Sequence, residues 1–502
     1  MKTYSREQFV KDVTAGIIVA IIALPLSIAL ALASGVGPEA GIFTAIVAGF
    51  VISALGGSSV QIAGPTAAFA TIVAGIVAKN GLDGLVIATI LAGIFLILMG
   101  LCHFGTLIRF IPYTITTGFT AGIAVTIVIG QLKDFFGVTY PDGVKPIETM
   151  EKLHAFVENC GTVNLSAVIV GVVSLAILII SPYIFKKIPG SLLAVVAGIL
   201  MVKFLPLKAS TIGDLYSISN ALPGFHLPAL SLAAVKDAIP NAFTIAVLAA
   251  IESLLSCVVA DGMINGKHRS DMELVAQGAG NIASALFGGI PATGAIARTA
   301  ANIKNGGRTP IAGMVHSITL VLVLVVLMPY AGMIPMPTIA AILFVVAYNM
   351  CQWRPFAHLI QTAPKSDILV LLVTFFLTVV FDLVVAIEIG MLLTCLLFMK
   401  RMSDETHVDS WTYVDDDSDA VNDHMQKLAK EIRVYEITGP LFFGAANAIE
   451  HIVVKDFTKC LVLRMRSVPA LDSTAMNALQ NLVKYCEAKG ITPIFSHVNE
   501  QP

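Results

Sequence analysis

Apolar runs of about twenty residues follow one another through roughly the first 400 residues of this chain, with short polar breaks between them. Hydrophobic residues make up 56% of the 502 residues and charged residues only 13%. A run of this length matches the hydrocarbon thickness of a bilayer, and one soluble core cannot bury so many of them. The sequence therefore predicts a polytopic α-helical membrane protein. Its formal net charge of −2 gives no indication of a nucleic-acid partner.

The positions of the runs predict fourteen membrane-spanning segments. The predicted segments are residues 12–33, 40–56, 65–78, 83–103, 112–131, 166–184, 189–205, 241–262, 275–287, 293–303, 311–328, 335–350, 367–382 and 384–400. Basic residues fall in alternate loops and tails, which by the positive-inside rule identifies the cytoplasmic side. These residues are Lys2, Arg6, Lys11, Arg109, Lys186, Lys187, Lys267, Arg269, Lys304, Arg308, Arg354, Lys400 and Arg401. We therefore expect a multi-pass protein of the cell membrane with both termini in the cytoplasm.

Two of the apolar segments, the third and the tenth, are interrupted in the same way. Residues 61–69 and residues 288–299 each contain Gly, Pro and a hydroxyl side chain where a spanning helix would be continuous. Each is the third segment of a set of seven, and because seven is odd, the second set must be inverted relative to the first. We expect two half-helices that enter from opposite faces, with their N-termini meeting inside the membrane.

A helix that begins inside the membrane favours the binding of an anion. Its first N–H groups have no partner within the helix, and the helix dipole adds roughly half a positive charge at that end. Unpaired backbone at this depth is tolerated only where it lines a cavity. Interrupted segments at matching positions of two halves are also typical of the substrate site of a transporter. The sequence therefore predicts a protein that carries anions across a membrane.

The composition changes after residue 402. Residues 403–430 carry many Asp and Glu side chains, including Asp415, Asp416 and Asp417, and are expected to form an acidic linker. Residues 431–502 alternate between strand and helix patterns, which predicts a small α/β domain. The predicted strands are residues 433–437, 460–465 and 491–496, and the predicted helices are residues 444–455 and 473–488.

Motifs throughout the chain resemble those of the SulP anion transporters, the solute carrier 26 group. In the first half, the matching motifs are Leu24-Pro25, the run Gly37 to Gly41, and the run Gln61 to Ala68. In the second half they are Ile251 to Ser256, Val258 to Gly262, His268, Glu273-Leu274, Gln277-Gly278, Asn281, Phe287 to Gly294, and Arg298-Thr299. The resemblance covers essentially the whole chain.

The resemblance implies an inverted repeat of seven plus seven helices, divided into a core domain and a gate domain, and an elevator-like motion of one against the other. On this chain the transport domain would cover residues 1–402, with the core at about 12–103 and 241–328 and the gate at about 112–205 and 335–400. Secondary active transport, homodimers and a cytoplasmic STAS domain at residues 431–502 are also implied. That domain is one strand and one helix short of the family pattern at Pro502, which predicts a truncated or reduced domain.

The resemblance further implies an anion site between the third and tenth helices. Its candidate residues are Gln61, Thr66, Ala67, Ala68, Ala292, Thr293, Gly294, Ala295 and Arg298. Thr66 and Thr293 are expected in the first turn of each half-helix, with plain N-capping as the alternative. Arg298 is expected to help hold the anion, as in some members of the family, because an unpaired charge is costly at that depth. The alternative is a side chain that extends toward the cytoplasmic face.

A coupling-ion site is implied beside the anion site. Glu252 lies in an apolar segment and Ser256 follows one turn later on the same face. In sodium-coupled bicarbonate members, the matching carboxylate and hydroxyl resemble a cation site, to which Thr293 would add an oxygen. Such oxygens suit Na⁺, and a buried glutamate could equally take up a proton. The alternative is a hydrogen-bonded clamp between helices. No cofactor is expected beyond coupling Na⁺ or H⁺.

Three other features each have a functional and a structural interpretation. Glu39 is a candidate proton acceptor or an exposed loop acid. Ser473 resembles the position phosphorylated in STAS-type anti-sigma antagonists, while the Asp472-Ser473-Thr474 sequence also fits a helix N-cap. The charged residues of the stretch 261–273 are expected to form a salt-bridged internal loop. They are Asp261, Lys267, His268, Arg269, Asp271 and Glu273.

The leading function is a secondary active transporter of small inorganic anions, of the sulfate or bicarbonate class, coupled to Na⁺ or H⁺ or working by exchange. A permease for dicarboxylates or nucleobases on the same fold is the alternative, and the prolines and Arg298 disfavour nucleobases. A sensor that uses its membrane region only as an anchor would not need fourteen spans. No enzyme is predicted, because no nucleophile–base pair, phosphate loop or metal-ligand cluster is found. The expected partners are the anion, the bilayer and a second copy of the chain.

Overall fold

The computed structural model describes residues 4–106, 112–141, 146–184, 189–205, 207–216, 218–219, 221–228, 231–381, 383–411, 431–444, 449, 452 and 457–502. The chain divides into two compact units, Met1–Gly390 and Met391–Pro502, and each is described here by itself. The predicted helix 444–455 and most of the predicted linker lie outside the described residues, as do Lys2, Arg109, Lys186 and Lys187.

The first unit is helical. Its longer helices are α1 (Arg6–Ala33), α2 (Pro38–Leu55), α3 (Ala70–Leu101), α4 (Tyr113–Phe136), α6 (Leu165–Ile184), α7 (Gly190–Phe204), α9 (Leu232–Ile264), α10 (Ser270–Leu286), α11 (Ile296–Lys304), α12 (Pro310–Ala331), α13 (Met336–Cys351) and α15 (Lys365–Val380). Helix α16 (Leu383–Asp404) begins in this unit and continues into the second. Eight helices of the described ranges are long and apolar enough to cross a bilayer. The protein is therefore a multi-pass membrane protein, and the total of fourteen spans stays a prediction.

Each of the fourteen predicted segments overlaps a helix of the structure. Two of them, residues 65–78 and 83–103, correspond to the two arms of α3. The arms are separated at Gly81, whose φ of 71° lies in the left-handed region that glycine adopts without strain. Three shorter helices were not predicted, because their few apolar residues do not form a membrane-length run: α5 (Thr149–Glu158), α8 (Ile212–Leu215) and α14 (Trp353–Thr362).

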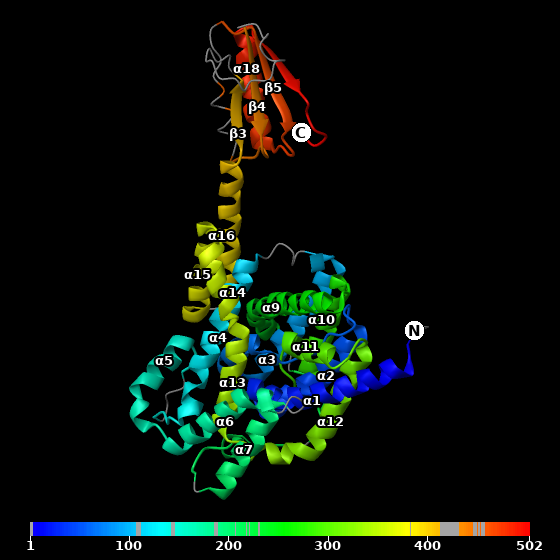
Figure 1. The fold of residues 1–502 in the computed structure, drawn as a ribbon, viewed down its shortest axis with the longest axis vertical. Coiled ribbons are helices and arrows are strands. Elements are labelled where there is room, and N and C mark those ends of the chain that lie inside the picture. The colour runs from blue at the N-terminus through cyan, green and yellow to red at the C-terminus, as the bar shows by residue number, and fades with distance from the viewer. Residues whose placement is uncertain are drawn as a thin grey trace. The chain divides into compact units, whose positions relative to one another are not determined.

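The helices of the first unit form two packed groups (Figure 1). In one group, α2 packs against α1, α10 and α12, and α3 packs against α9 and α10. In the other group, α4 packs against α13 and α15, and α6 packs against α7 and α13. Helix α1 also contacts α7 and α13, so it joins the two groups.

The second unit contains a four-stranded sheet in the order β3-β4-β5-β6, visible with α18 in Figure 1. Strands β4 (Ile432–Thr438), β5 (Cys460–Ser467) and β6 (Thr492–Ser496) are mutually parallel and agree with the predicted strands. Helix α18 (Ser473–Ala488) connects β5 to β6, as a parallel crossover requires. The prediction of a small α/β domain is confirmed.

The prediction of an acidic linker is wrong for its first residues, 403–411. Helix α16 continues to Asp404, and residues His407–Trp411 form strand β3, which pairs antiparallel with β4. Polar and acidic side chains are compatible with this position because β3 is an edge strand of the sheet. Linker character remains a prediction for the residues beyond Trp411.

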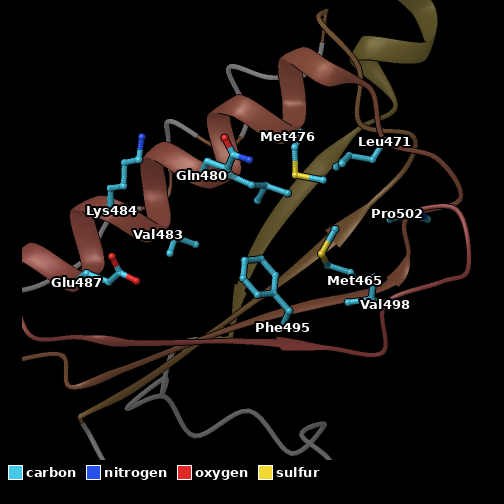
Figure 2. A pocket seen from close by; sticks show the side chains of 11 residues that line it. Met465, Leu471, Met476, Gln480, Val483, Lys484, Glu487, Phe495, Val498 and Pro502 are labelled. Carbon is cyan, nitrogen blue, oxygen red and sulfur yellow. The ribbon is translucent and has the colours of Figure 1, made fainter.

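An apolar hollow of about 470 Å³ lies between α18 and the sheet (Figure 2). Figure 2 shows Met476 and Val483 of α18 on one side and Met465 of β5 and Phe495 of β6 on the other. Leu471, Leu479, Val498 and Pro502 complete the apolar part of its lining. It belongs to the second unit and takes no part in the site described next.

Candidate functional site

The two interrupted segments meet inside the first unit, as predicted. Residues Ala63–Gly64 form β1 and residues Thr293–Gly294 form β2, and the two pair antiparallel with Ala63 opposite Gly294. The N–H of Ala295 also donates to the carbonyl of Ile62 at 2.9 Å. The short sheet satisfies part of the backbone that the interrupted helices leave unpaired, which buried backbone requires.

The helices that follow this sheet begin at slightly different points. After β1, Thr66 is the N-cap of a 3₁₀ turn, η1 (Ala67–Phe69), which leads into α3. After β2, α11 begins at Ile296 with Ala295 as its N-cap. The prediction that Thr293 lies in the first turn of a half-helix is therefore wrong, because this residue lies in β2.

Glu252 of α9 joins the two segments. Its Oε2 accepts hydrogen bonds from the Thr66 hydroxyl at 2.9 Å and from the Thr293 hydroxyl at 3.0 Å. Both threonine side chains are thus engaged by the carboxylate, and Thr66 makes no side-chain capping bond. Among the described residues, no salt bridge includes Glu252. A half-buried carboxylate held by hydroxyls alone is suited to receive a cation or a proton.

Ser256 is directed to a different partner. Its hydroxyl lies 3.5 Å from the Thr299 hydroxyl of α11, and both residues are buried. Thr299 in turn accepts a hydrogen bond from the N–H of Ile62 at 3.1 Å. The structure therefore joins Ser256 to the backbone beside β1, while Glu252 is joined to Thr66 and Thr293.

Arg298 is fully enclosed in the first unit, with 1% of its surface exposed. One nitrogen, Nη2, donates to the Pro65 carbonyl at 3.2 Å and to the Ser27 hydroxyl at 3.3 Å. The Nε and Nη1 atoms have no hydrogen-bond partner among the described residues, and no salt bridge of those residues includes Arg298. The Arg298 side chain therefore does not reach the surface of the unit. The guanidinium sits where the chain enters η1 with spare donors.

Two glycines of the site allow close approach. A Cβ atom at Gly64 would collide with Arg298 Nη1, and a Cβ atom at Gly294 would collide with the Gln61 amide. Three neighbouring candidate residues of the anion site have small, buried side chains, which allow close approach to the backbone. These residues are Ala67, Ala68 and Ala292.

Gln61 is held by Glu273, a residue whose role the sequence did not reveal. Gln61 Nε2 donates to Glu273 Oε1 at 2.8 Å, and Gln61 Oε1 accepts from the Cys257 thiol at 3.0 Å. Glu273 is completely buried in α10 and also accepts from Gln277 Nε2 at 2.9 Å. Its Oε2 accepts from the backbone N–H groups of Gly57 and Ser58 at 2.8 and 3.1 Å.

Glu273 was expected in a salt-bridged loop, and this prediction is wrong. The side chain instead orders residues 57–61, the segment that leads into β1. Helical spacing could have indicated it, because Glu273, Gln277 and Asn281 recur every four residues on one face of α10. Asn281 completes this row by exchanging hydrogen bonds with the backbone of Ala292 at 2.8 and 2.9 Å.

We predict that Glu273→Ala destabilises the first unit by about 3 kcal/mol or more, because each buried donor left without an acceptor costs roughly 1–3 kcal/mol. Thermal unfolding of the purified protein in detergent measures the effect. Glu158→Ala is the matched control, since Glu158 is exposed at the end of α5. Equal melting temperatures for Glu273→Ala and the control would contradict the role assigned to Glu273.

The remaining candidates lie elsewhere. Glu39 is not an exposed loop acid: it lies in the first turn of α2, half-buried, with its carboxylate folded against Gly37. His268 Nδ1 lies 2.7 Å from Asp261 Oδ2, and His103 Nδ1 lies 2.8 Å from Asp271 Oδ2, both within hydrogen-bonding distance.

The regulatory candidate Ser473 is the first residue of α18 and is exposed. Beside it, Asp472 is the N-cap, and its Oδ1 accepts from the N–H of Ala475 at 2.8 Å. The structural interpretation of this motif as a helix cap is therefore correct for Asp472.

Comparison with known proteins agrees with this architecture. SLC26A9 has the same fold, with a TM-score of 0.87 at 18% identity over 100% of this chain and 86% of that chain. The transmembrane domain of a cyanobacterial bicarbonate transporter, BicA, aligns with a TM-score of 0.69 at 30% identity over 76% of this chain and 98% of that domain.

Sequence relatives cover nearly the whole chain. The Bacillus subtilis protein YvdB, whose name assigns sulfate transport only provisionally, is 41% identical over 96% of this chain and 90% of its own length. The bicarbonate transporter BicA of Picosynechococcus is 32% identical over 94% of this chain and 86% of its own length. Residues 426–502 match the STAS domain, and residues 9–374 match the Sulfate permease family. The chain is therefore a member of the sulfate permease (SulP) family with a C-terminal STAS domain.

Proposed function

We propose that this protein is a secondary active transporter of small inorganic anions of the sulfate or bicarbonate class. The observation that carries the proposal is Arg298, a buried cation with two unpartnered nitrogens, Nε and Nη1, beside the paired strands β1 and β2 that precede η1 and α11. An uncompensated charge in an apolar environment is costly, and a bound anion would compensate it. The names of the relatives, which include bicarbonate transporters, support the same substrate class.

The proposed anion site uses three kinds of donor. Arg298 supplies the charge, the N–H groups at the starts of η1 and α11 supply oriented dipoles, and Thr66 and Thr293 supply hydroxyls. The small residues Ala67, Ala68, Ala292, Gly294 and Ala295 let an oxyanion approach the backbone. Gln61 contributes by positioning β1, because its polar atoms already bond to Glu273 and Cys257.

Glu252 is proposed as the coupling group. Its carboxylate binds the same two threonine hydroxyls that would face the anion, so a negative charge on Glu252 repels the substrate at short range. Na⁺ or a proton on Glu252 removes that repulsion and leaves the hydroxyls free to turn. Each ion would then bind more tightly when the other is already bound, which is the thermodynamic requirement for symport.

We further propose an elevator-type motion of the core (about 12–103 and 241–328) against the gate (about 112–205 and 335–400). An apolar cavity of about 120 Å³ between the two helix groups supports this division. It is lined by Leu24 and Pro25 of α1, Ile42 of α2, Val195 of α7 and Met328 of α12, among others. An apolar contact without directional bonds can slide at little cost in hydrogen bonding.

The proposal also includes the setting of the protein. The basic residues of alternate loops support a cell-membrane location with both termini in the cytoplasm. Membership of the family supports a homodimer, to which the STAS domain would contribute contacts or regulatory binding. Ser473 is exposed at the start of α18 and is a candidate site of such regulation.

The test of the proposed function is uptake by liposomes that contain the purified protein. Radiolabelled sulfate, bicarbonate, chloride and fumarate are offered separately, each under a Na⁺ gradient, a pH gradient or a membrane potential. We expect saturable, gradient-driven accumulation of sulfate or bicarbonate. Preferential uptake of fumarate would support the alternative, a dicarboxylate permease on the same fold. Absence of uptake for all four anions would refute anion transport.

A further inference from the structure

A second buried polar residue lies behind Arg298. His316 of α12 has 0% of its surface exposed, and neither ring nitrogen has a hydrogen-bond partner among the described residues. Buried polar groups are almost always hydrogen-bonded, through protein or ordered water, so such a side chain needs an explanation. The proposed transport site does not use it.

His316 and Arg298 border the same short stretch of backbone. A Cβ atom at Gly49 of α2 would lie 3.3 Å from the Ala63 carbonyl and 3.9 Å from His316 Nδ1. A Cβ atom at the adjacent β1 residue, Gly64, would meet Arg298 Nη1. The two side chains therefore approach β1 from α12 and α11.

Two glycines lie at the contact between α2 and α12 beside His316. Gly49 and Gly313 are the α2 and α12 residues at the contact, and a Cβ at Gly313 would meet the hydroxyl of Ser53. The Ser53 hydroxyl is also buried and has no partner among the described residues. Three unpartnered polar side chains, Ser53, His316 and Arg298, thus share one buried region between α2, α12 and β1.

Ordered water can pair with the hydrogen-bond donors and acceptors of this region. Arg298 offers three N–H donors on Nε and Nη1, and a neutral imidazole offers one donor and one acceptor. The two side chains make no direct hydrogen bond to each other, but water can accept from Arg298 and exchange a hydrogen bond with the imidazole. A neutral imidazole also adds no positive charge beside the guanidinium.

We propose that His316 is a positioning residue for the anion site, joined to Arg298 through buried water. The link holds the charged guanidinium beside β1. The Arg298 N–H donors are therefore already oriented toward the anion position before the anion binds. This inference rests on the proposed role of Arg298. It assigns to His316 no contact with the anion itself.

The test is a double-mutant cycle measured by uptake of radiolabelled sulfate and bicarbonate. We expect His316→Leu to raise the half-saturation concentration about tenfold, the size of one hydrogen bond to a charged group, with the maximal rate unchanged. His316→Gln, which keeps a donor and an acceptor, is expected to restore most of the affinity. In an Arg298→Ala background, His316→Leu is expected to have no further effect.

Three results would overturn the proposal. These are an unchanged half-saturation concentration for His316→Leu, an equal loss in the Arg298→Ala background, or a fall in maximal rate without a change in affinity. His358→Leu is the matched control, since His358 is exposed on α14. Melting temperatures of all variants in detergent identify any that fail to fold.

A second readout does not depend on transport. An experimental density map that resolves ordered water is expected to show a peak within hydrogen-bonding distance of both His316 and Arg298. If Arg298→Ala leaves anion affinity unchanged, the proposed anion site fails, but the map still decides the link between the two residues. Continuous protein packing around the imidazole, with no such peak, would refute the link.

Discussion

Replacement of Arg298 by alanine is expected to raise the half-saturation concentration for the transported anion by about a hundredfold or more. Removing one member of a buried charge pair costs roughly 2–5 kcal/mol, and each 1.4 kcal/mol corresponds to a factor of ten. Uptake by liposomes over a wide range of anion concentrations measures the change. Arg298→Lys is expected to fall between the wild type and Arg298→Ala, because lysine keeps the charge but loses the planar set of donors.

Stability measurements separate this effect from misfolding. In the absence of anion, Arg298 is a buried charge without a charged partner among the described residues, so its removal relieves a desolvation penalty. The melting temperature of Arg298→Ala without anion is therefore expected to equal or exceed that of the wild type. The rise in melting temperature that sulfate or bicarbonate produces in the wild type is expected to disappear.

The matched control is Lys304→Ala. Lys304 lies in the last turn of the same helix, α11, and is exposed, so its removal changes the net charge equally without altering the site. Its half-saturation concentration is expected to stay within about twofold of the wild type, as for other exposed charges. If Arg298→Ala and Lys304→Ala behave alike, Arg298 does not bind the anion.

Much of the fold could be predicted because membrane helices have a strong sequence signal. A run of about twenty apolar residues has few alternatives to a spanning helix, since lipid satisfies no backbone hydrogen bond. The meeting of the interrupted segments followed from proline and glycine at matching positions in two inverted halves. The structure pairs those segments as β1 and β2.

The details of the site could not be predicted in the same way. The hydroxyls of Thr66 and Thr293 bond to Glu252, which is distant in sequence, and no local pattern specifies that choice. Glu273 looked like one of several loop charges, because its acceptor role depends on backbone N–H groups of residues 57 and 58, more than 200 positions away. Strand β3 was missed because an edge strand tolerates the acidic composition of a linker.

Two carboxyl groups, Glu252 and Glu39, are candidates for the proposed coupling group, and their positions in the structure differ. Glu252 contacts both interrupted segments through Thr66 and Thr293, so its charge state acts directly on the proposed anion site. Glu39 lies in the first turn of α2, where the helix dipole stabilises its negative charge, and among the described residues no hydrogen bond or salt bridge joins it to the site. Comparison of Glu252→Gln with Glu39→Gln therefore tests which carboxyl group carries the coupling.

Glu252→Gln is expected to abolish the dependence of uptake on the driving-ion gradient while leaving anion binding intact. Glutamine keeps an oxygen that can accept from the two threonine hydroxyls, but it carries no charge to repel the anion and binds neither Na⁺ nor a proton. A tenfold gradient of a monovalent ion stores about 1.4 kcal/mol per ion, and a carrier that no longer binds the ion cannot use it. Initial uptake rates with and without the gradient are therefore expected to agree within about twofold.

The control for this variant is Glu388→Gln, which neutralises an exposed glutamate of α16 and is expected to keep the full gradient response. Two outcomes discriminate between the coupling groups. Loss of the response in Glu252→Gln alone supports the proposed site of Glu252, Thr66 and Thr293, because Glu252 bonds to the two hydroxyls that are proposed to face the anion. Full gradient dependence in Glu252→Gln, with a loss in Glu39→Gln, would transfer the coupling role to the start of α2.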